Sequence, residues 1–468
     1  MVRVHSETQL PSSSPNWTDG YNILSSIQHE QDEHIRKYEA RMKVYKDILL
    51  NQTSNTTSLK HIPKGLLGIL GPLITSMVYT LIPVHNVFEM PQYWYEFPTQ
   101  LLFGLVHHWA AMILYKCSFY MNITYIQGIK HFLIMFCING IVLLSTYAAE
   151  YLIWTVYLQY SFPFPLNGYV IAATLMVSFY LTLWFRFPSE WRKDESFRRR
   201  LLYFLIAITL NQAVLFEYAG ITTILLTIPD EYQWIVVAFF PVVREVNLLI
   251  SRYFARKARN GDITTATIVC CHAINTTHCA FLAYTVGSIA TFTSSVIILT
   301  EHFLINICLC LWIIYINKKT PDAIERQIDL LQEVVINETV ETMVPILYLL
   351  CLTIAYFGPN SALIGNVGSS KWQYQVVEDF GYSFSLVFIF CLVDVCSAII
   401  GSILLWCFCG IKLHRAYVEI QNEFGIAFSF ILGTNLNGVS IQYVYHWIIQ
   451  TKFYYDCYPF LTIKDTQQ

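Results

Sequence analysis

The sequence contains few charged residues. They make up only 13% of the 468 residues, with a formal net charge of −3, whereas an ordinary soluble domain carries about 25%. This small negative charge excludes the broad basic surface that nucleic-acid binding requires, so we expect no nucleic-acid partner. Hydrophobic residues account for 55% of the chain, which also excludes a mainly disordered protein.

The sequence also lacks several common catalytic, nucleotide-binding and metal-binding motifs. The 13 cysteines include no Cys-x-x-Cys pair and fall mostly inside apolar runs, so they predict no disulfide framework. The chain has no Gly-x-x-x-x-Gly-Lys loop, no Gly-x-Ser-x-Gly elbow and no His-Glu-x-x-His pair. These absences exclude P-loop ATPases, α/β-hydrolases and zincin proteases. We therefore expect no cofactor and no metal, and we favour a protein that is not an enzyme.

Long uncharged runs dominate what is present. Each is long enough to cross a bilayer, which takes about 20 apolar residues. The runs without Asp, Glu, Lys or Arg are 65–88, 97–115, 151–185, 263–300, 342–370 and 424–451. The sequence therefore predicts an all-α, polytopic transmembrane helix bundle whose first partner is the lipid bilayer.

About eleven spans are predicted between residues 64 and 450. Pro163 and Pro165 divide one long run, and Pro229-Asp230-Glu231 forms a turn between the fifth and sixth spans. The predicted spans are 65–84, 98–116, 131–154, 166–186, 201–227, 233–251, 264–286, 290–316, 341–358, 382–409 and 424–450.

The remaining segments are polar. Residues 1–63 form an N-terminal segment with an amphipathic helix at 26–50, and residues 451–468 form a short tail. Between spans eight and nine, Thr320-Pro321 is typical of a helix start and predicts a separate linker helix on the cytoplasmic face.

Basic residues indicate the orientation. They cluster at 186–200, 252–259, 318–319 and 412–415, whereas the alternate loops contain neither Lys nor Arg. Basic loops lie preferentially in the cytoplasm. We therefore predict that these loops and the N-terminus are cytoplasmic.

One ion pair is predicted from depth alone. Glu217 lies about thirteen residues before the turn between spans five and six, and Arg244 about thirteen after it. At ~1.5 Å per residue the two side chains reach the same depth. A buried pair neutralises two charges that are costly in a bilayer, either permanently or as a pair that breaks and reforms during function.

A second polar group is predicted around spans seven and eight. If their turn centres near Ser288, Glu301 and His302 lie level with Asn275, with His272 and His278 one turn to either side. Asn306 shares a face with His302, and Asp394 interrupts span ten alone. This is the best candidate for a proton or cation site, although buried histidines often serve only as hydrogen-bonded core. A zinc site at His272, Asn275 and Cys279 has no supporting spacing.

These features favour a secondary transporter or permease, with buried acids and His near the membrane midplane. A membrane receptor or ligand-gated channel is the alternative, and an intramembrane enzyme is less favoured. The substrate, a small molecule or ion, is not readable from the residues. A homo-oligomer is compatible with every one of these classes.

Overall fold

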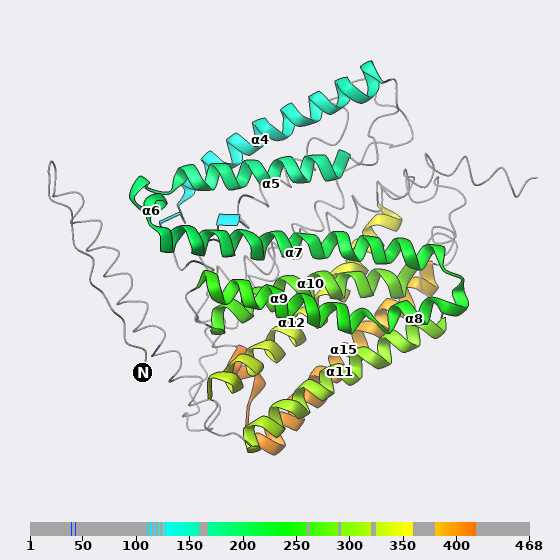
Figure 1. Cartoon of the computed structure of the whole chain (residues 1–468). Coiled ribbons are helices and arrows are strands. Elements are labelled where there is room, and N and C mark those ends of the chain that lie inside the picture. Colours follow the sequence, from blue (N-terminus) through cyan, green and yellow to red (C-terminus); the bar gives the residue numbers. More distant parts are fainter. Residues whose placement is uncertain are drawn as a thin grey trace, which may run out of the picture. The chain divides into compact units, whose positions relative to one another are not determined.

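The computed structural model describes residues 128–158, 167–259, 263–288, 292–319, 324–358 and 380–417, with a few single positions nearer the N-terminus. The chain divides into two compact units, 1–54 and 55–468, and all the helices below belong to the second. Helices account for 93% of the structure, and no described residue lies in a strand. The all-α fold class is therefore confirmed (Figure 1).

The described elements follow one another with short connections. In chain order they are α4 (Ile129–Tyr151), the π-helical turn η3 (Leu152–Tyr157), α5 (Asn167–Arg186), α6 (Ser189–Lys193), α7 (Glu195–Thr227), the 3-10 turn η4 (Asp230–Tyr232), α8 (Gln233–Val237), α9 (Phe240–Ala258), α10 (Ile263–Ser288), α11 (Phe292–Lys319), α12 (Ile324–Phe357) and α15 (Phe380–Cys409).

Local sequence explains several helix ends. Asp194 caps α7 by accepting hydrogen bonds from the backbone N–H groups of Ser196 (3.1 Å) and Phe197 (3.2 Å). Pro241 stands at the start of α9, where the missing N–H of proline separates α9 from α8. Gly410 ends α15 with a φ of 69°, a left-handed conformation that glycine adopts without a steric penalty.

Five described helical stretches are long and apolar enough to cross a membrane. They are Ile129–Tyr151, Gln233–Ala258, Phe292–Lys319, Gln327–Ile354 and Phe380–Cys409. The stretch in α12 is the most enclosed, with 59% of its apolar window buried against 28–39% in the other four. These helices indicate a membrane-embedded protein.

Apolar side chains on the outer surface of the helices also indicate a membrane-embedded protein. On α15, Leu392, Ile399 and Trp406 are between 49% and 59% exposed, and they recur at seven-residue steps along one face. Large apolar faces of this kind are rare on soluble monomers and are expected where a helix contacts lipid.

The predicted count of about eleven spans is not confirmed. Eight predicted spans, from 131–154 to 382–409, fall on described helices. The spans 65–84 and 424–450, almost all of 98–116, the N-terminal segment 1–63 apart from Glu39 and Lys43, and the tail 451–468 lie outside the described residues.

The predicted division before span nine is wrong. A linker helix followed by a separate span at 341–358 was expected, but one continuous helix, α12, covers Ile324–Phe357. Pro345 lies inside it without ending it. The polar residues that suggested a cytoplasmic surface are buried instead, including Gln332 and Glu333.

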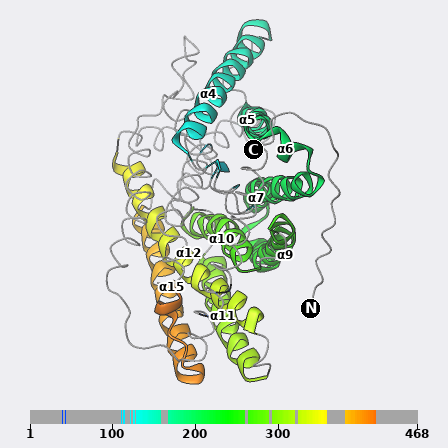
Figure 2. The same cartoon turned by 90° about the vertical axis from the view of Figure 1, so that its left-hand side faces the viewer.

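Helix α10 lies at the centre of the bundle. It contacts α12 most extensively, and also α7, α9, α11 and α15. Helices α7, α9 and α10 lie side by side in both views, and α11 lies along α15 (Figures 1 and 2). This arrangement brings side chains from α9, α10, α11, α12 and α15 towards one interior region.

The basic helix ends meet at the same end of the bundle. Arg200 near the start of α7 donates from Nε to the carbonyl of Ala258 at the end of α9, at 3.0 Å. Lys318 at the end of α11 lies 5.3 Å from the ring centre of Phe408, at the end of α15. The basic start of α7 therefore lies beside the basic end of α9, and the basic end of α11 lies beside the end of α15.

Candidate functional site

A ladder of ion pairs joins α9 to α12. The two helices run antiparallel, so residue numbers that decrease by four along α9 pair with residue numbers that increase by four along α12. The pairs are Arg256–Asp329 at 2.9 Å, Arg252–Glu333 at 2.5 Å and Arg244–Glu341 at 3.6 Å. The step between the last two pairs is occupied by Leu248 and Asn337, and Asn337 accepts a hydrogen bond from Asn275 of α10.

The last pair of the ladder is almost completely buried. Arg244 is 2% exposed and Glu341 is 1% exposed. Arg244 also pairs with Glu245, whose side chain is 48% exposed, at 3.0 Å. The guanidinium therefore lies between a buried and an accessible carboxylate.

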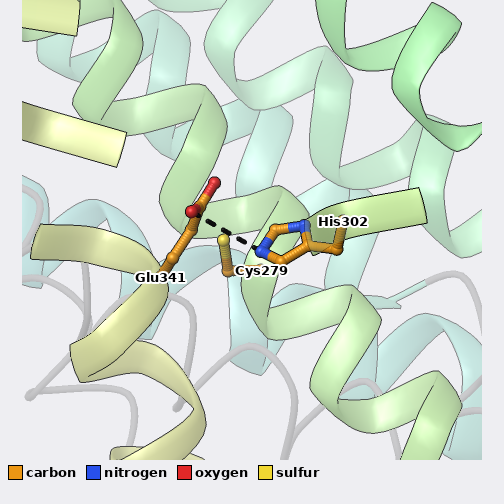
Figure 3. A group of neighbouring side chains, drawn as sticks. All are labelled: Cys279, His302 and Glu341. Carbon is orange, nitrogen blue, oxygen red and sulfur yellow. Dashed lines mark ion pairs between the residues drawn. The ribbon is translucent and has the colours of Figure 1, made fainter. Parts of the chain in front are cut away.

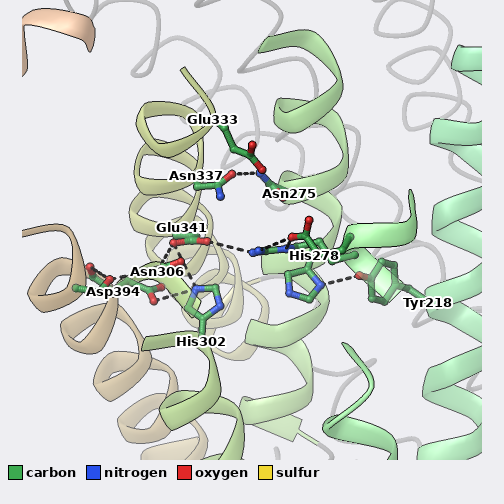
Figure 4. A network of polar contacts seen from close by, with 12 residues as sticks. Tyr218, Asn275, His278, His302, Asn306, Glu333, Asn337, Glu341 and Asp394 are labelled. Carbon is green, nitrogen blue, oxygen red and sulfur yellow. Dashed lines mark hydrogen bonds and ion pairs between the residues drawn. The ribbon is translucent and has the colours of Figure 1, made fainter. Parts of the chain in front are cut away.

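Glu341 connects this ladder to α11. Its Oε2 accepts a hydrogen bond from Asn306 Nδ2 at 2.5 Å and lies 3.6 Å from His302 Nε2 (Figure 4). Asn306 also contacts Ser397 Oγ of α15 at 3.3 Å. A single carboxylate therefore holds side chains from α9 and α11 together.

His302 stands between two acids. Its Nε2 lies 3.2 Å from Asp394 Oδ1 of α15, opposite Glu341 of α12. All three side chains are 3% exposed or less. Phe390 covers the imidazole edge-on, with ring centres 5.4 Å apart. We call Arg244, His302, Glu341 and Asp394 the central cluster.

Polar contacts continue from the central cluster to α7. The imidazole of His278 on α10 lies 6.5 Å from that of His302, measured between ring centres. His278 Nδ1 shares a 2.6 Å hydrogen bond with the hydroxyl of Tyr218. Figure 4 shows this chain of side chains crossing from α15 to α7.

The structure brings together three of the predicted site residues, namely His302, Asn306 and Asp394, around Glu341. His272 is buried on α10, where its carbonyl accepts a hydrogen bond from Thr276 at 2.7 Å. Glu301 is only half-buried and faces a different space from His302. Glu301 therefore does not lie in one cluster with the histidines, as the sequence had predicted.

Glu301 lines an open groove of about 900 Å³ between α9 and α11. The groove wall is mostly apolar, and Arg244, Glu245 and Glu333 form its charged part. Asp394 does not line this groove. Glu301 therefore borders this groove, whereas Asp394 is buried beside His302.

The predicted Glu217–Arg244 ion pair is not formed. Glu217 accepts a hydrogen bond from Asn247 Nδ2 at 2.7 Å, whereas Arg244 faces Glu245 and Glu341. The depth estimate was sound, because α7 and α9 do form a packed hairpin. However, Arg244 and Asn247 are three residues apart, and the direction around the helix decides which residue meets Glu217.

Sequence reasoning missed Glu341, which occupies the centre of the site. It is the first residue of the predicted span 341–358 and was not among the predicted site residues. A signal was nevertheless present: Asp329, Glu333, Asn337 and Glu341 repeat every four residues, which places them on one helix face.

Two prolines interrupt helical hydrogen bonding near the central cluster. Pro345 lacks the N–H that would bond to the carbonyl of Glu341, four residues earlier. Pro241 lies one turn before Arg244, beside the break between α8 and α9. Each proline therefore removes one backbone hydrogen bond within about one turn of a residue of the central cluster.

One group in this region has metal-ligand character. Cys279, His302 and Glu341 each place a ligand atom within 4.8 Å of the other two. The structure thus puts Cys279 beside His302 and Glu341 rather than in the set with His272 and Asn275 considered from sequence.

Comparison with protein-family models, curated proteins and solved structures finds no match for this chain.

Proposed function

We propose that this protein is a secondary transporter whose solute or coupling cation binds at the central cluster. One observation carries the proposal: all four charged side chains lie at mid-span. Glu341 and Asp394 are at the middle of Gln327–Ile354 and Phe380–Cys409, and Arg244 and His302 are within about one turn of the middle of their spans.

Such side chains are expensive at this depth. An ionisable residue at the centre of a membrane helix costs ~3 kcal/mol on insertion scales, so these residues usually mark an ion or substrate path. A buried ion pair is also weak support for stability, since apolar replacements are often as stable. The central cluster is therefore better explained by binding than by helix packing alone.

The backbone interruptions support the same proposal. Transporters commonly bind their cargo near mid-membrane, where helices are broken and free backbone groups help to hold it. Here the break between α8 and α9 and the proline within α12 flank Arg244 and Glu341. The two helices carrying them are natural candidates for the moving elements.

We further propose that the end of the bundle carrying Arg200, Lys257 and Lys318 faces the cytoplasm. Basic residues near span ends are retained on that side during insertion. The N-terminus would then be cytoplasmic too, with the bilayer as the protein's main partner.

Cysteine accessibility tests the transporter proposal. Ser397→Cys places a nearly isosteric thiol beside Asn306, in a background without the native cysteines. A charged, membrane-impermeant thiol reagent should modify it from each face of the membrane in separate experiments, without the ionic current of a channel. Ser383→Cys is the matched control, because Ser383 is 1% exposed on the same helix and should stay protected.

The outcomes separate the classes. Protection of Ser397→Cys from both faces would mean that the central cluster is a sealed structural core. Modification accompanied by steady current would favour a ligand-gated channel. That alternative has its own support, since the open groove beside Glu301 could admit a ligand from the side of the bundle.

A further inference from the structure

Three donor side chains converge from three helices beside the central cluster. Cys279 comes from α10, His302 from α11 and Glu341 from α12 (Figure 3). Their ligand atoms all lie within 4.8 Å of one another. The side chains are 0%, 3% and 1% exposed, so bulk water does not solvate them.

The donor types are those of a transition-metal site. Thiolate, imidazole and carboxylate bind zinc at about 2.3, 2.0 and 2.1 Å, respectively, in a tetrahedral arrangement. Ligand atoms around such an ion are therefore separated by roughly 3.3–3.8 Å. His302 Nε2 and Glu341 Oε2 are already 3.6 Å apart, so only a small inward movement of the thiol is needed.

Asp394 adds a second carboxylate beside this group. Its Oδ1 lies 3.2 Å from His302 Nε2, and the side chain is fully buried. Among the residues that the structure describes, its Oδ2 has no hydrogen-bond donor. A buried acceptor without a donor is costly, and a cation bound beside Asp394 would lower that cost.

The surroundings are also suited to a metal. Asn306 donates to Glu341 Oε2 and contacts Ser397, which fixes the carboxylate in the manner of an outer-shell partner. Arg244 approaches the opposite oxygen, Oε1, at 3.6 Å. Its positive charge weakens the attraction for a second cation, which suits a site from which the ion must also leave.

We infer that Cys279, His302 and Glu341 bind one divalent transition-metal ion of the zinc and cobalt class, with Asp394 adding negative charge beside them. The inference rests on the proposed function in one respect: the ion would be the cation that the transporter carries. Soft thiolate and imidazole donors exclude magnesium and calcium as the preferred ions, because these favour oxygen ligands.

Cobalt(II) tests the site directly, because a thiolate bound to cobalt gives a near-ultraviolet charge-transfer band. The purified full chain should bind one equivalent of cobalt(II) with this band and with the visible bands of tetrahedral cobalt. Cys279→Ser should abolish the near-ultraviolet band and weaken binding by about tenfold or more. Cys279→His should keep the visible bands and lose only the sulfur band.

Cys117→Ser is the matched control, since Cys117 is also buried but belongs to a different hydrophobic cluster. It should leave both bands unchanged. Absence of the sulfur band in the wild type, or its persistence in Cys279→Ser, overturns the inference. Accessibility of Ser397→Cys is measured without metal, so the transporter proposal stands or fails independently of this result.

Discussion

Arg244 Nη1 lies 3.6 Å from Glu341 Oε1, and the two side chains are 2% and 1% exposed. This contact joins the break between α8 and α9 to the proline-containing middle of α12. It also links the open groove, which Arg244 lines, to His302 and Asp394 behind it. Changes at these two residues therefore report on the whole site.

Glu341→Gln should destabilise the protein strongly. The substitution leaves the buried guanidinium of Arg244 with only the accessible Glu245, and an uncompensated buried charge costs ~3–5 kcal/mol. Glu245→Gln is the control, because removing a half-exposed partner costs only ~0–1 kcal/mol. Thermal unfolding of both variants in detergent measures the difference. Equal effects would show that Arg244 does not depend on Glu341.

Glu217 should couple to Asn247 and not to Arg244. A double-mutant cycle of Glu217→Ala with Asn247→Ala should reveal an interaction of ~0.5–1.5 kcal/mol from the 2.7 Å hydrogen bond. The cycle with Arg244→Ala should be additive within ~0.5 kcal/mol. Unfolding free energies decide the matter, and strong coupling to Arg244 would restore the pair expected from sequence.

Gly401→Ala should separate α15 from α11. A Cβ at Gly401 would lie 2.8 Å from Cys310 Sγ, closer than van der Waals contact allows, and overpacking of this kind costs ~1–3 kcal/mol. Cys310→Ala removes the obstructing sulfur, so the double variant should recover most of the loss. Thermal stability of the single and double variants provides the test. Failure of Cys310→Ala to rescue would exclude this contact as the cause.

Labelling should place the basic helix ends on one side of the membrane. Lys193→Cys and Lys257→Cys are both exposed near basic ends and should react with an impermeant reagent only from the cytosol. Glu231→Cys, exposed in the turn between α7 and α8, should react only from the opposite face. Reaction of Lys193→Cys and Lys257→Cys from different faces would contradict the helix arrangement itself.

Apolar run length was sufficient to predict the helical class, and eight of the predicted spans fall on described helices, of which five stretches are long and apolar enough to cross a membrane. This signal is strong because a bilayer demands about 20 apolar residues per helix. It failed at α12, where charged residues such as Asp329 and Glu333 led to the prediction of a separate cytoplasmic linker helix. Charges buried against other charges cannot be recognised from hydropathy, because their partners, Arg252 and Arg244, belong to a distant part of the sequence.

The site was predicted only in part for a related reason. Counting residues from a turn gave the depth of Glu301 and His302 relative to Asn275, but not the direction in which each side chain points. Glu301 and His302 are neighbours in sequence yet face different spaces, as successive residues on a helix do. Cys279 and Glu341 could be joined to His302 only once three helices were packed together.

The central claim is that the buried charges are retained for function and not for stability. The most direct measurement is the thermal unfolding of a variant in which all four are replaced together by apolar residues of similar size: Arg244→Met, His302→Leu, Glu341→Met and Asp394→Val. Removing every partner leaves no orphaned charge, and buried ion pairs replaced by apolar residues of similar volume are often as stable as the originals or ~1–4 kcal/mol more so. We predict a melting temperature equal to or above that of the wild type. A variant that unfolds well below the wild type would contradict the account and make the central cluster a structural core.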